Sequence, residues 1–312
     1  MSPPPSSGAP LLERFWQRAQ PGHVPDGAAS WHDETRVLQG MGIAMETALQ
    51  FLHFERPAWE VFQRWLQDQR RDGASSNSPL PVEDVLDASD LTSWEEHGYL
   101  VLKQAVSEGD CDCARRAIWE FLDASPDDPA SWYRPHAAKY GLMLTLFDHP
   151  ALERNRRAAR IRNAYRQLYG SDAIFHNIDK VSFNPPERDG FHFLGSGLHW
   201  DVSLEPPIPF RLQGLLYLSD CAADEGAFHC VPGFHGRIED WLDGLPLGTD
   251  PREAAPLLLK DEMAAVPAAA GDFVIWHQAL PHCATPNRGK KPRLVQYLTY
   301  LPEVETEIRP WK

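Results

Sequence analysis

A histidine and an aspartate stand two residues apart in the segment "GLHWDVS", residues 197–203. The β-prone residues around them predict a strand, in which alternate side chains point to the same face. His199 and Asp201 could then approach one metal ion while Trp200 points away. Such a pair arises easily by chance in a chain with 13 histidines and 44 acidic residues, so a metal site requires a third ligand.

The best third ligand is His282, in the segment "ALPHCATPNRGKKPRLVQYLTY". Two histidines and one carboxylate on one side of a metal leave the opposite positions open, which is the pattern of non-haem Fe(II) oxygenases. Arg293 follows at the start of the segment "RLVQYLTYLP". Its guanidinium fork suits a dicarboxylate co-substrate, and the plainer alternative is a solvated arginine beside Lys290 and Lys291.

Short β-prone segments, separated by turns rich in Gly and Pro, follow from about residue 174. They are "IFHNIDKVSFN", "GLHWDVSLE", "FRLQGLLYLS", "GAFHCVP", "GDFVIWHQ" and "RLVQYLTYLP". Regularly punctuated short strands favour an all-β barrel or sandwich, and a jelly roll fits this pattern. The predicted fold class is therefore mainly β with flanking helices.

Helices are predicted before this β-rich part. Residues 1–30 are rich in Pro, Ser, Gly and Ala, which is typical of a disordered start, and 72–81 has the composition of a linker. Between them, Trp59, Phe62 and Leu66 recur at helical spacing after Pro57. We expect an N-terminal extension over 1–85, partly disordered and then helical, followed by a catalytic domain over 86–312.

The second part opens with "LTSWEEHGYLVL", which predicts a short helix ending at Gly98 and then a strand. The following segment, "SEGDCDCARRAIWEFLDA", predicts an amphipathic helix with Ser107 as its N-cap.

The charge and cysteine content limit the function classes. A net charge of −14 argues against nucleic acid or an anionic membrane surface as a partner. The five cysteines lack the spacing of zinc or redox motifs, no segment has the ~20 apolar residues of a membrane span, and "MSPPPSSGAP" is no signal peptide. We expect a cytoplasmic protein acting on a small molecule; the composition leaves its oligomeric state open.

Five blocks of the chain together resemble the phytanoyl-CoA dioxygenase (PhyH) family of Fe(II)- and 2-oxoglutarate-dependent oxygenases. They are His199 with Asp201, "EGAFHCVPGFH" (225–235), "GDFVIWH" (271–277), "LPHCATPN" (280–287) and Arg293. Their order and spacing match the family over roughly residues 90–305. The resemblance implies a double-stranded β-helix core (a cupin-like jelly roll) with iron held by His199, Asp201 and His282.

The resemblance also implies that Arg293 binds the distal carboxylate of 2-oxoglutarate and that Asn287 occupies the place of a family asparagine. Ala284 stands where a serine is common, and the neighbouring Thr285 can supply the missing hydroxyl. Two further departures are Trp200 in place of glutamine and Phe234 in place of serine. The strand pattern adds Gln213 and Lys180 as residues that line the site, with an outward polar face as the alternative.

The implied reaction uses Fe(II), 2-oxoglutarate and dioxygen to oxidise a C–H bond of a small molecule, releasing succinate and CO2. Asp201 favours hydroxylation, because the family's halogenases carry a small residue in its place. No catalytic residue beyond the metal ligands is expected, and the substrate expected is an intermediate of secondary metabolism. The alternatives are a non-catalytic jelly-roll binding protein and another metal-dependent enzyme, such as a zinc hydrolase, neither of which needs Arg293.

Overall fold

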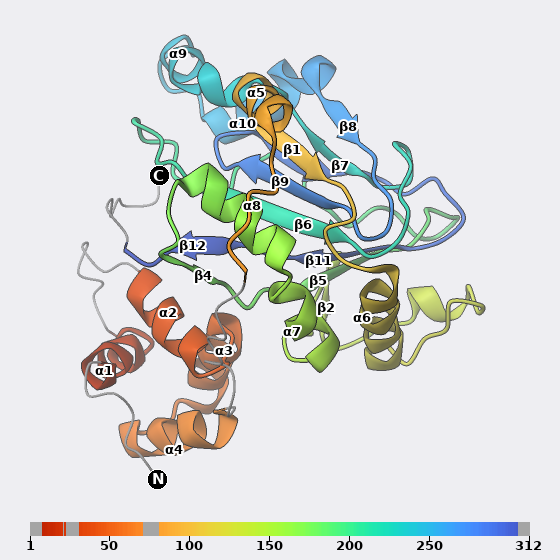
Figure 1. The fold of residues 1–312 in the computed structure, drawn as a ribbon. Coiled ribbons are helices and arrows are strands. Elements are labelled where there is room, and N and C mark those ends of the chain that lie inside the picture. Colours follow the sequence, from red (N-terminus) through yellow and green to blue (C-terminus); the bar gives the residue numbers. More distant parts are fainter. Residues whose placement is uncertain (1–7, 21, 23–30, 71–80, 305–312) are drawn as a thin grey trace. The chain divides into compact units, whose positions relative to one another are not determined.

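The computed structural model describes residues 8–20, 22, 31–70 and 81–304 (Figure 1). They divide into two compact units, and the first contains the chain up to Pro81, Ala173–Ile178 and a segment from Leu301. The second unit contains Val82–Asp172 and Asp179–Tyr300. The predicted functional division at residue 85 stays a prediction. Nearly all of the predicted linker lies outside the described residues. Within residues 1–30, which were expected to be disordered at their start, Ala9–Arg18 form a helix.

In the described part of the first unit, four helices surround their own apolar core. These are α1 (Ala9–Arg18), α2 (His32–Gly40), α3 (Met45–Glu55) and α4 (Trp59–Gln69). Phe62 and Leu66 of α4 are buried, and Trp59 packs against the same core. The helical pattern predicted after Pro57 is therefore confirmed. Strands β4 (Ile174–His176) and β12 (Tyr300–Pro302) pair in a separate two-stranded sheet.

The helices of the second unit are α5 (Ala88–His97), α6 (Glu108–Phe121), α7 (Pro150–Arg156), α8 (Ala159–Tyr169), α9 (Ile238–Asp243) and α10 (Pro251–Leu258). Three short 3-10 turns are Ser131–Tyr133, Phe234–Gly236 and Lys260–Glu262. The predicted end of α5 is confirmed at Gly98, which has φ +72°. The predicted start of α6 is confirmed as well, since the Ser107 side chain accepts a hydrogen bond from the Asp110 N–H.

Two antiparallel sheets form the core of this unit. A large seven-stranded sheet has the order β1-β9-β6-β11-β5-β3-β2, and a small three-stranded sheet has the order β10-β7-β8. The large sheet consists of β1 (Tyr99–Leu102), β2 (Lys139–Tyr140), β3 (Met143–Leu144), β5 (Val181–Asn184), β6 (Leu212–Tyr217), β9 (Phe273–His277) and β11 (Arg293–Tyr297). The small sheet consists of β7 (Phe228–Cys230), β8 (Ala264–Val266) and β10 (His282–Ala284).

Side chains between the two sheets join them into a jelly roll. Phe228 of the small sheet packs on Trp276 of the large sheet, with ring centroids 4.5 Å apart. The Tyr217 hydroxyl of the large sheet donates to the Val266 carbonyl of the small one at 2.9 Å. The predicted fold class, mainly β with flanking helices, is therefore confirmed.

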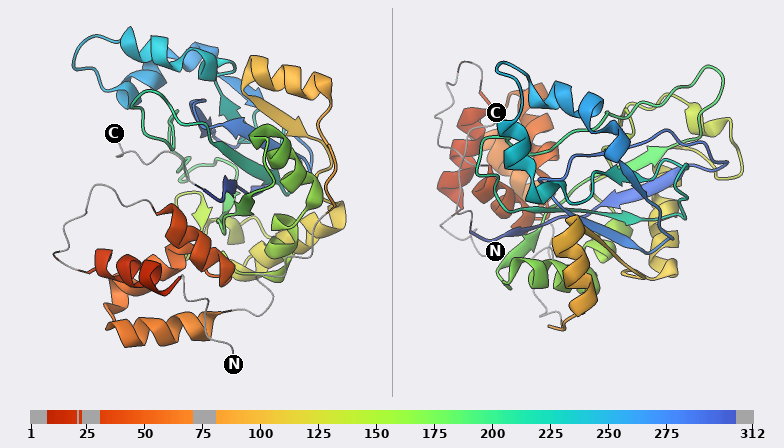
Figure 2. Two further views of the ribbon diagram at one scale, coloured as in Figure 1. Left: turned by 60° about the vertical axis from the view of Figure 1, so that its left-hand side comes forward. Right: turned by 90° about the horizontal axis from the view of Figure 1, so that it is seen from above.

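Helices cover the outer faces of the two sheets (Figures 1 and 2). Helix α8 packs on the large sheet through Tyr165, whose ring lies 6.0 Å from that of Phe273. Gly214 of β6 sits beneath this contact, where a Cβ atom would lie 2.6 Å from the Tyr165 hydroxyl oxygen. Because neighbouring strand residues point to opposite faces, Gln213 and Leu215 are directed to the interior. Among the residues the structure describes, no helix is long and apolar enough to cross a membrane.

The prediction of a strand over residues 197–203 is wrong. Only His199 pairs there, in an isolated bridge in which it exchanges backbone hydrogen bonds of 3.0 and 2.9 Å with His282. The next hydrogen-bonded pair of an antiparallel ladder here would join Asp201 to the backbone of Leu280. Its N–H already donates to the His277 carbonyl, and its carbonyl accepts from the His282 ring. The ladder therefore stops after one pair, and the chain bends away.

Candidate metal centre

Three side chains with metal-binding atoms meet in the second unit: His199, Asp201 and His282. Their ligand atoms all lie within 4.8 Å of one another. His282 Nε2 is 3.3 Å from Asp201 Oδ2, and His199 Nε2 is 3.7 Å from Asp201 Oδ1. Within the described part of the chain, no other group of three His, Cys, Asp or Glu side chains is so disposed. The structure thus brings together the three residues predicted from the sequence.

Both imidazole rings are oriented by backbone carbonyls two residues earlier. His199 Nδ1–H donates to the Gly197 carbonyl at 2.8 Å, and His282 Nδ1–H donates to the Leu280 carbonyl at 3.0 Å. Because Nδ1 of each ring is used in this way, Nε2 is the ring nitrogen that faces the carboxylate of Asp201 and could hold a metal ion. Such hydrogen bonds are typical of histidines that bind metals.

The carboxylate of Asp201 is held by an amide from the large sheet. Gln213 Nε2 donates to Asp201 Oδ2 at 2.9 Å, and the Trp276 indole N–H donates to Gln213 Oε1 at 3.1 Å. The indole fixes which end of the amide faces Asp201, because an indole nitrogen can only donate.

Burial acts to raise the pKa of Asp201, but the hydrogen bonds from His282 and Gln213 and the nearby imidazoles outweigh it and hold the pKa well below its usual value. Burial is also the main reason that the pKa of His199 is lowered, and His282 adds to this effect. An ionised carboxylate and a neutral imidazole are the forms that bind a metal ion.

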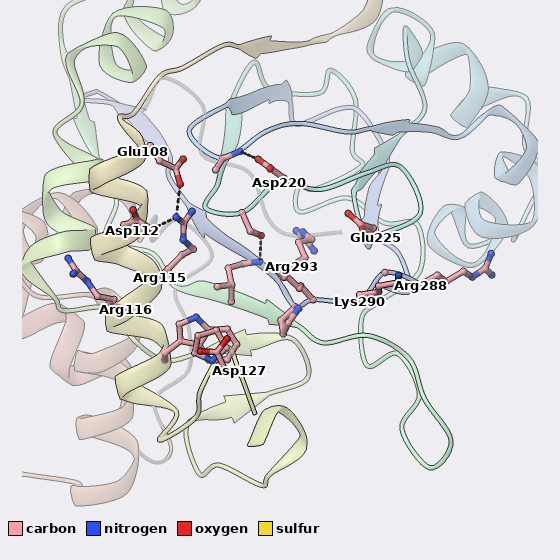
Figure 3. Close-up of a pocket in the computed structure, with 18 of the residues that line it drawn as sticks. Glu108, Asp112, Arg115, Arg116, Asp127, Asp220, Glu225, Arg288, Lys290 and Arg293 are labelled. Carbon is pink, nitrogen blue, oxygen red and sulfur yellow. Dashed lines mark hydrogen bonds and ion pairs between the residues drawn. The ribbon is translucent and has the colours of Figure 1, made fainter. Parts of the chain in front are cut away.

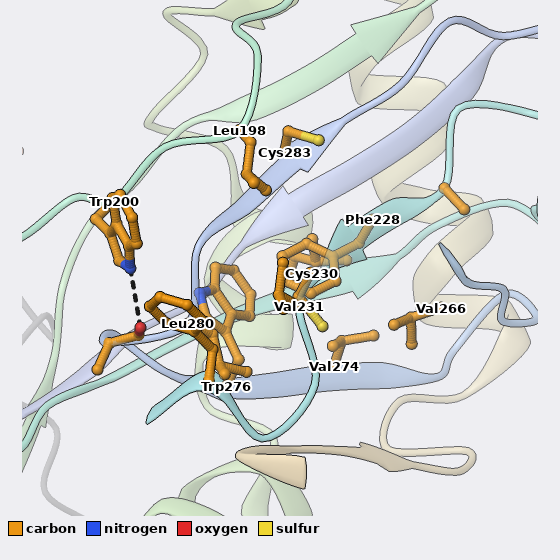
Figure 4. Close-up of a cluster of buried hydrophobic side chains, with 14 of the residues drawn as sticks. Leu198, Trp200, Phe228, Cys230, Val231, Val266, Val274, Trp276, Leu280 and Cys283 are labelled. Atoms are coloured by element: carbon orange, nitrogen blue, oxygen red, sulfur yellow. Dashed lines mark hydrogen bonds between the residues drawn. The ribbon is translucent and has the colours of Figure 1, made fainter. Parts of the chain in front are cut away.

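Trp200, between two of these residues, belongs to a cluster of buried apolar side chains (Figure 4). Its side chain is 2% exposed and lies 5.8 Å from the rings of both Phe234 and Trp241. Its indole N–H donates to the Ala279 carbonyl at 2.9 Å, a contact drawn as a dashed line in Figure 4. The tryptophan therefore packs the segment into the apolar core of the second unit.

Arg293 is buried at the start of β11, with 2% of its surface exposed. Its Nε and Nη1 atoms have no hydrogen-bond partner among the described residues. The Tyr297 hydroxyl, on the same face of the strand, does contact the guanidinium, which opposes the raising effect of burial on the pKa of Tyr297. A buried guanidinium with free donors favours a bound anion, because burying an unpaired charge is costly. The alternative of a solvated arginine is therefore excluded.

Arg293 and the three side chains His199, Asp201 and His282 line one cavity of about 340 Å³, which we call the metal cavity. It is lined by Tyr140, Gly141, Leu142, Met143, Asp179, Lys180, Leu194, Gly195, Ser196, His199, Asp201, Gln213, Gly214, Leu215, Phe228, Trp276, His282, Cys283, Ala284, Arg293, Tyr297 and Thr299. The donor set, the open cavity and the free guanidinium nitrogens fit a metal ion together with a carboxylate-bearing co-substrate.

The other predicted co-substrate residues occupy different places. Gln213 and Lys180 line the metal cavity, and Gln213 is engaged with Asp201. Thr285 and Asn287 are not among its lining residues. Asn287 donates to the carbonyls of Asn184 and Lys291 at 2.9 and 2.8 Å, and Thr285 donates to the Ala227 carbonyl at 3.3 Å. Their binding of 2-oxoglutarate stays a prediction.

Trp276 and Tyr297 are among the cavity residues that were not singled out from the sequence. Trp276 lies in the quoted block "GDFVIWH", and strand register places it opposite Gln213. Tyr297 lies four residues after Arg293 on β11, so strand alternation places both side chains on one face and could have indicated it.

A second, open groove of about 1000 Å³ also reaches Arg293 (Figure 3). Acidic and basic side chains are mixed along it, and several of them pair within the groove. Arg115 Nη2, for example, lies 2.6 Å from Glu108 Oε1 and also contacts Asp112. Lys290 and Lys291 belong to this groove and not to the metal cavity.

The chain belongs to the phytanoyl-CoA dioxygenase (PhyH) family, which it matches over residues 94–295. The predicted family is thereby confirmed, and the protein is a non-haem iron- and 2-oxoglutarate-dependent dioxygenase.

Several known proteins are similar to this chain. The methylphosphonate hydroxylase of Gimesia maris is 25% identical over 235 residues, which cover 72% of this chain and 84% of the relative. The solved structure of SnoK, a non-haem α-ketoglutarate-dependent carbocyclase from nogalamycin biosynthesis, matches with a TM-score of 0.53 and 21% identity, covering 72% of this chain and 87% of SnoK. EctD from S. alaskensis matches with a TM-score of 0.52 and 17% identity, covering 74% and 84%. SnoK and EctD therefore share the fold of this chain.

Proposed function

We propose that the protein hydroxylates a C–H bond of a small molecule, with Fe(II) bound by His199, Asp201 and His282. In the same proposal, Arg293 binds the distal carboxylate of 2-oxoglutarate. The observation that carries it is a buried guanidinium with two free nitrogens lining the same cavity as the three metal-binding side chains. A zinc hydrolase or a simple binding module has no need of that cation.

Each residue of the site has a defined part in this proposal. When bound, iron and 2-oxoglutarate supply the oxidising chemistry, in which the co-substrate becomes succinate and CO2 and an oxygen atom enters the substrate. Gln213 keeps the carboxylate of Asp201 turned toward the two histidines. Phe228 and Trp276 form an apolar wall that excludes water from the reacting C–H bond. No separate acid or base is required.

The substrate we propose is small and partly polar. The metal cavity must hold the co-substrate as well, and its lining mixes apolar Leu142, Met143 and Leu215 with Asp179 and Lys180. An intermediate of secondary metabolism fits this description, and the relative from Gimesia maris is named for a small phosphonate. We further propose a cytoplasmic enzyme without a nucleic-acid partner, supported by five free cysteines and a net charge of −14.

The test is anaerobic addition of Fe(II) and 2-oxoglutarate to metal-free protein. We expect a visible metal-to-ligand charge-transfer band in the wild type and no band in Asp201→Ala. Exposure to air with candidate substrates should then release succinate. A wild type that gives neither band nor succinate would contradict the proposal and favour a binding protein. A hydrolytic activity with Zn²⁺ would indicate a different metal enzyme.

A further inference from the structure

Asp201 lies on a segment that no β-ladder supports. The single bridge of this segment is at His199, and Asp201 and Val202 lie in a bend. A carboxylate on a bent segment can point in many directions unless its backbone is fixed by other groups. The metal centre nevertheless needs this carboxylate within reach of two imidazoles, so the contacts of the neighbouring carbonyls become important.

A single guanidinium binds the carbonyls on both sides of Asp201. Arg252 Nη1 donates to the Trp200 carbonyl at 2.8 Å, and Nη2 donates to the Val202 carbonyl at 2.6 Å. The two carbonyls belong to the residues directly before and after the aspartate. The arginine thus supplies donors to the two carbonyls, where a paired strand would have supplied backbone N–H groups.

The position of Arg252 is itself fixed by the start of α10. Asp250 is the N-cap of this helix, and its side chain accepts a hydrogen bond from the Arg252 N–H at 2.8 Å. Pro251 occupies the first position of the helix, where its ring favours the helical backbone. Ala255, one turn later, is fully buried in the apolar core that also contains Trp200. The guanidinium therefore projects from a well-anchored helix end.

We infer that Arg252 is a positioning residue of the metal centre, which fixes the backbone around Asp201 so that its carboxylate faces His199 and His282. This inference rests on the proposed ligand set. Lysine cannot replace the arginine, because its ammonium is a single point of charge and lacks the planar fork that reaches two carbonyls at once. Without the two hydrogen bonds from Arg252, the backbone around Asp201 can move. The carboxylate of Asp201 then faces His199 and His282 for a smaller share of the time.

The experiment uses Co(II) as a spectroscopic probe on the metal-free full-length protein. Wild type, Arg252→Lys and Asp201→Ala are titrated with Co(II), and the visible absorption of each is recorded at saturation. We expect Arg252→Lys to bind Co(II) about 10- to 100-fold more weakly, the range seen for groups that orient metal ligands. Its saturated spectrum should shift toward that of Asp201→Ala, which a purely structural defect would not cause.

The matched control is Arg237→Lys, which makes the same change at an exposed arginine that pairs with Glu262 near α9. It should bind Co(II) as the wild type does. Arg252→Gln serves as a second variant if Arg252→Lys folds poorly, and circular dichroism establishes the folded fraction in each case. Wild-type Co(II) affinity and spectrum in folded Arg252 variants would overturn the inference. Failure of the wild type itself to bind Co(II) would instead contradict the proposed metal site.

Discussion

Gln213 and Trp276 stand directly opposite each other on β6 and β9, and the indole of the second orients the amide of the first. The same amide donates to Asp201. A rigid sheet therefore determines how the carboxylate of a bent segment is turned. The hydrogen bond also occupies Asp201 Oδ2, the oxygen nearer to His282.

Replacing Gln213 by leucine should weaken metal binding while keeping the volume of the side chain. Asp201 then loses a donor, and we expect Fe(II) affinity to fall by about 10- to 100-fold, measured by anaerobic titration. Trp276→Phe is the comparison variant, because it keeps Gln213 and removes the indole N–H that orients the amide, so its loss should be smaller. Equal affinity in wild type and Gln213→Leu would show that this amide is not needed.

Arg293→Met should separate co-substrate binding from metal binding. The free guanidinium nitrogens have no role in holding the three metal-binding side chains, so Fe(II) affinity should stay at the wild-type value. Removing one partner of a buried charge pair costs about 2–5 kcal/mol, so the dissociation constant of 2-oxoglutarate should rise at least about 30-fold. The charge-transfer band, titrated with 2-oxoglutarate, measures this. Lys291→Met, in the second, open groove, should leave the affinity for 2-oxoglutarate unchanged. An unchanged affinity in Arg293→Met would show that the co-substrate binds elsewhere.

Trp200→Phe should lower the stability of the second unit. The substitution leaves the Ala279 carbonyl without its indole donor in a buried environment, at a cost of about 1–3 kcal/mol. Urea denaturation followed by circular dichroism measures this difference. Trp241→Phe is the control, since it alters ring contacts with Phe234 and Trp200. A loss in Trp200→Phe no larger than in the control would show that the hydrogen bond contributes little.

His277 should make the protein less stable in mild acid. Burial, and to a smaller extent the neighbouring His235, lower the pKa of His277 from 6.5 to about 4. Between these values the unfolded chain binds a proton that the folded chain excludes, so stability is full above pH 6.5 and falls as the pH falls toward 4. The loss amounts to at most about 3 kcal/mol. Thermal melts of wild type and His277→Gln across this range test it, with exposed His53→Gln as control; parallel curves for all three would refute it.

The grouping of His199, Asp201 and His282 was predictable because residue types and order carry that information. His199 and Asp201 do lie on the same side, although the strand that was expected to place them does not form. The reason for the missing strand is tertiary, since the backbone groups of Leu280 are already used by His277 and the ring of His282. No pattern within residues 197–203 reveals that competition.

Roles that depend on contacts between distant segments could not be predicted. Arg252 lies on a helix fifty residues from the carbonyls it binds, as its contact with Val202 shows. Gln213 was expected to face the cavity, and it does, but its partner is Asp201 and not a free co-substrate. Sequence alternation gives the face of a strand, whereas the partner across the interior depends on how the two sheets are packed.

Metal binding by Asp201 together with His282 would have a consequence for the stability of the protein. Asp201 and His282 are 81 residues apart in the chain, and the segment between them contains β6 to β9 together with α9 and α10. A bound ion would tie the two ends of this long segment together in the folded protein. At a free metal concentration about 100 times the dissociation constant, binding to the folded state alone adds about 2.7 kcal/mol. The supply of iron would then raise the free energy of unfolding of the jelly roll as well as permit turnover.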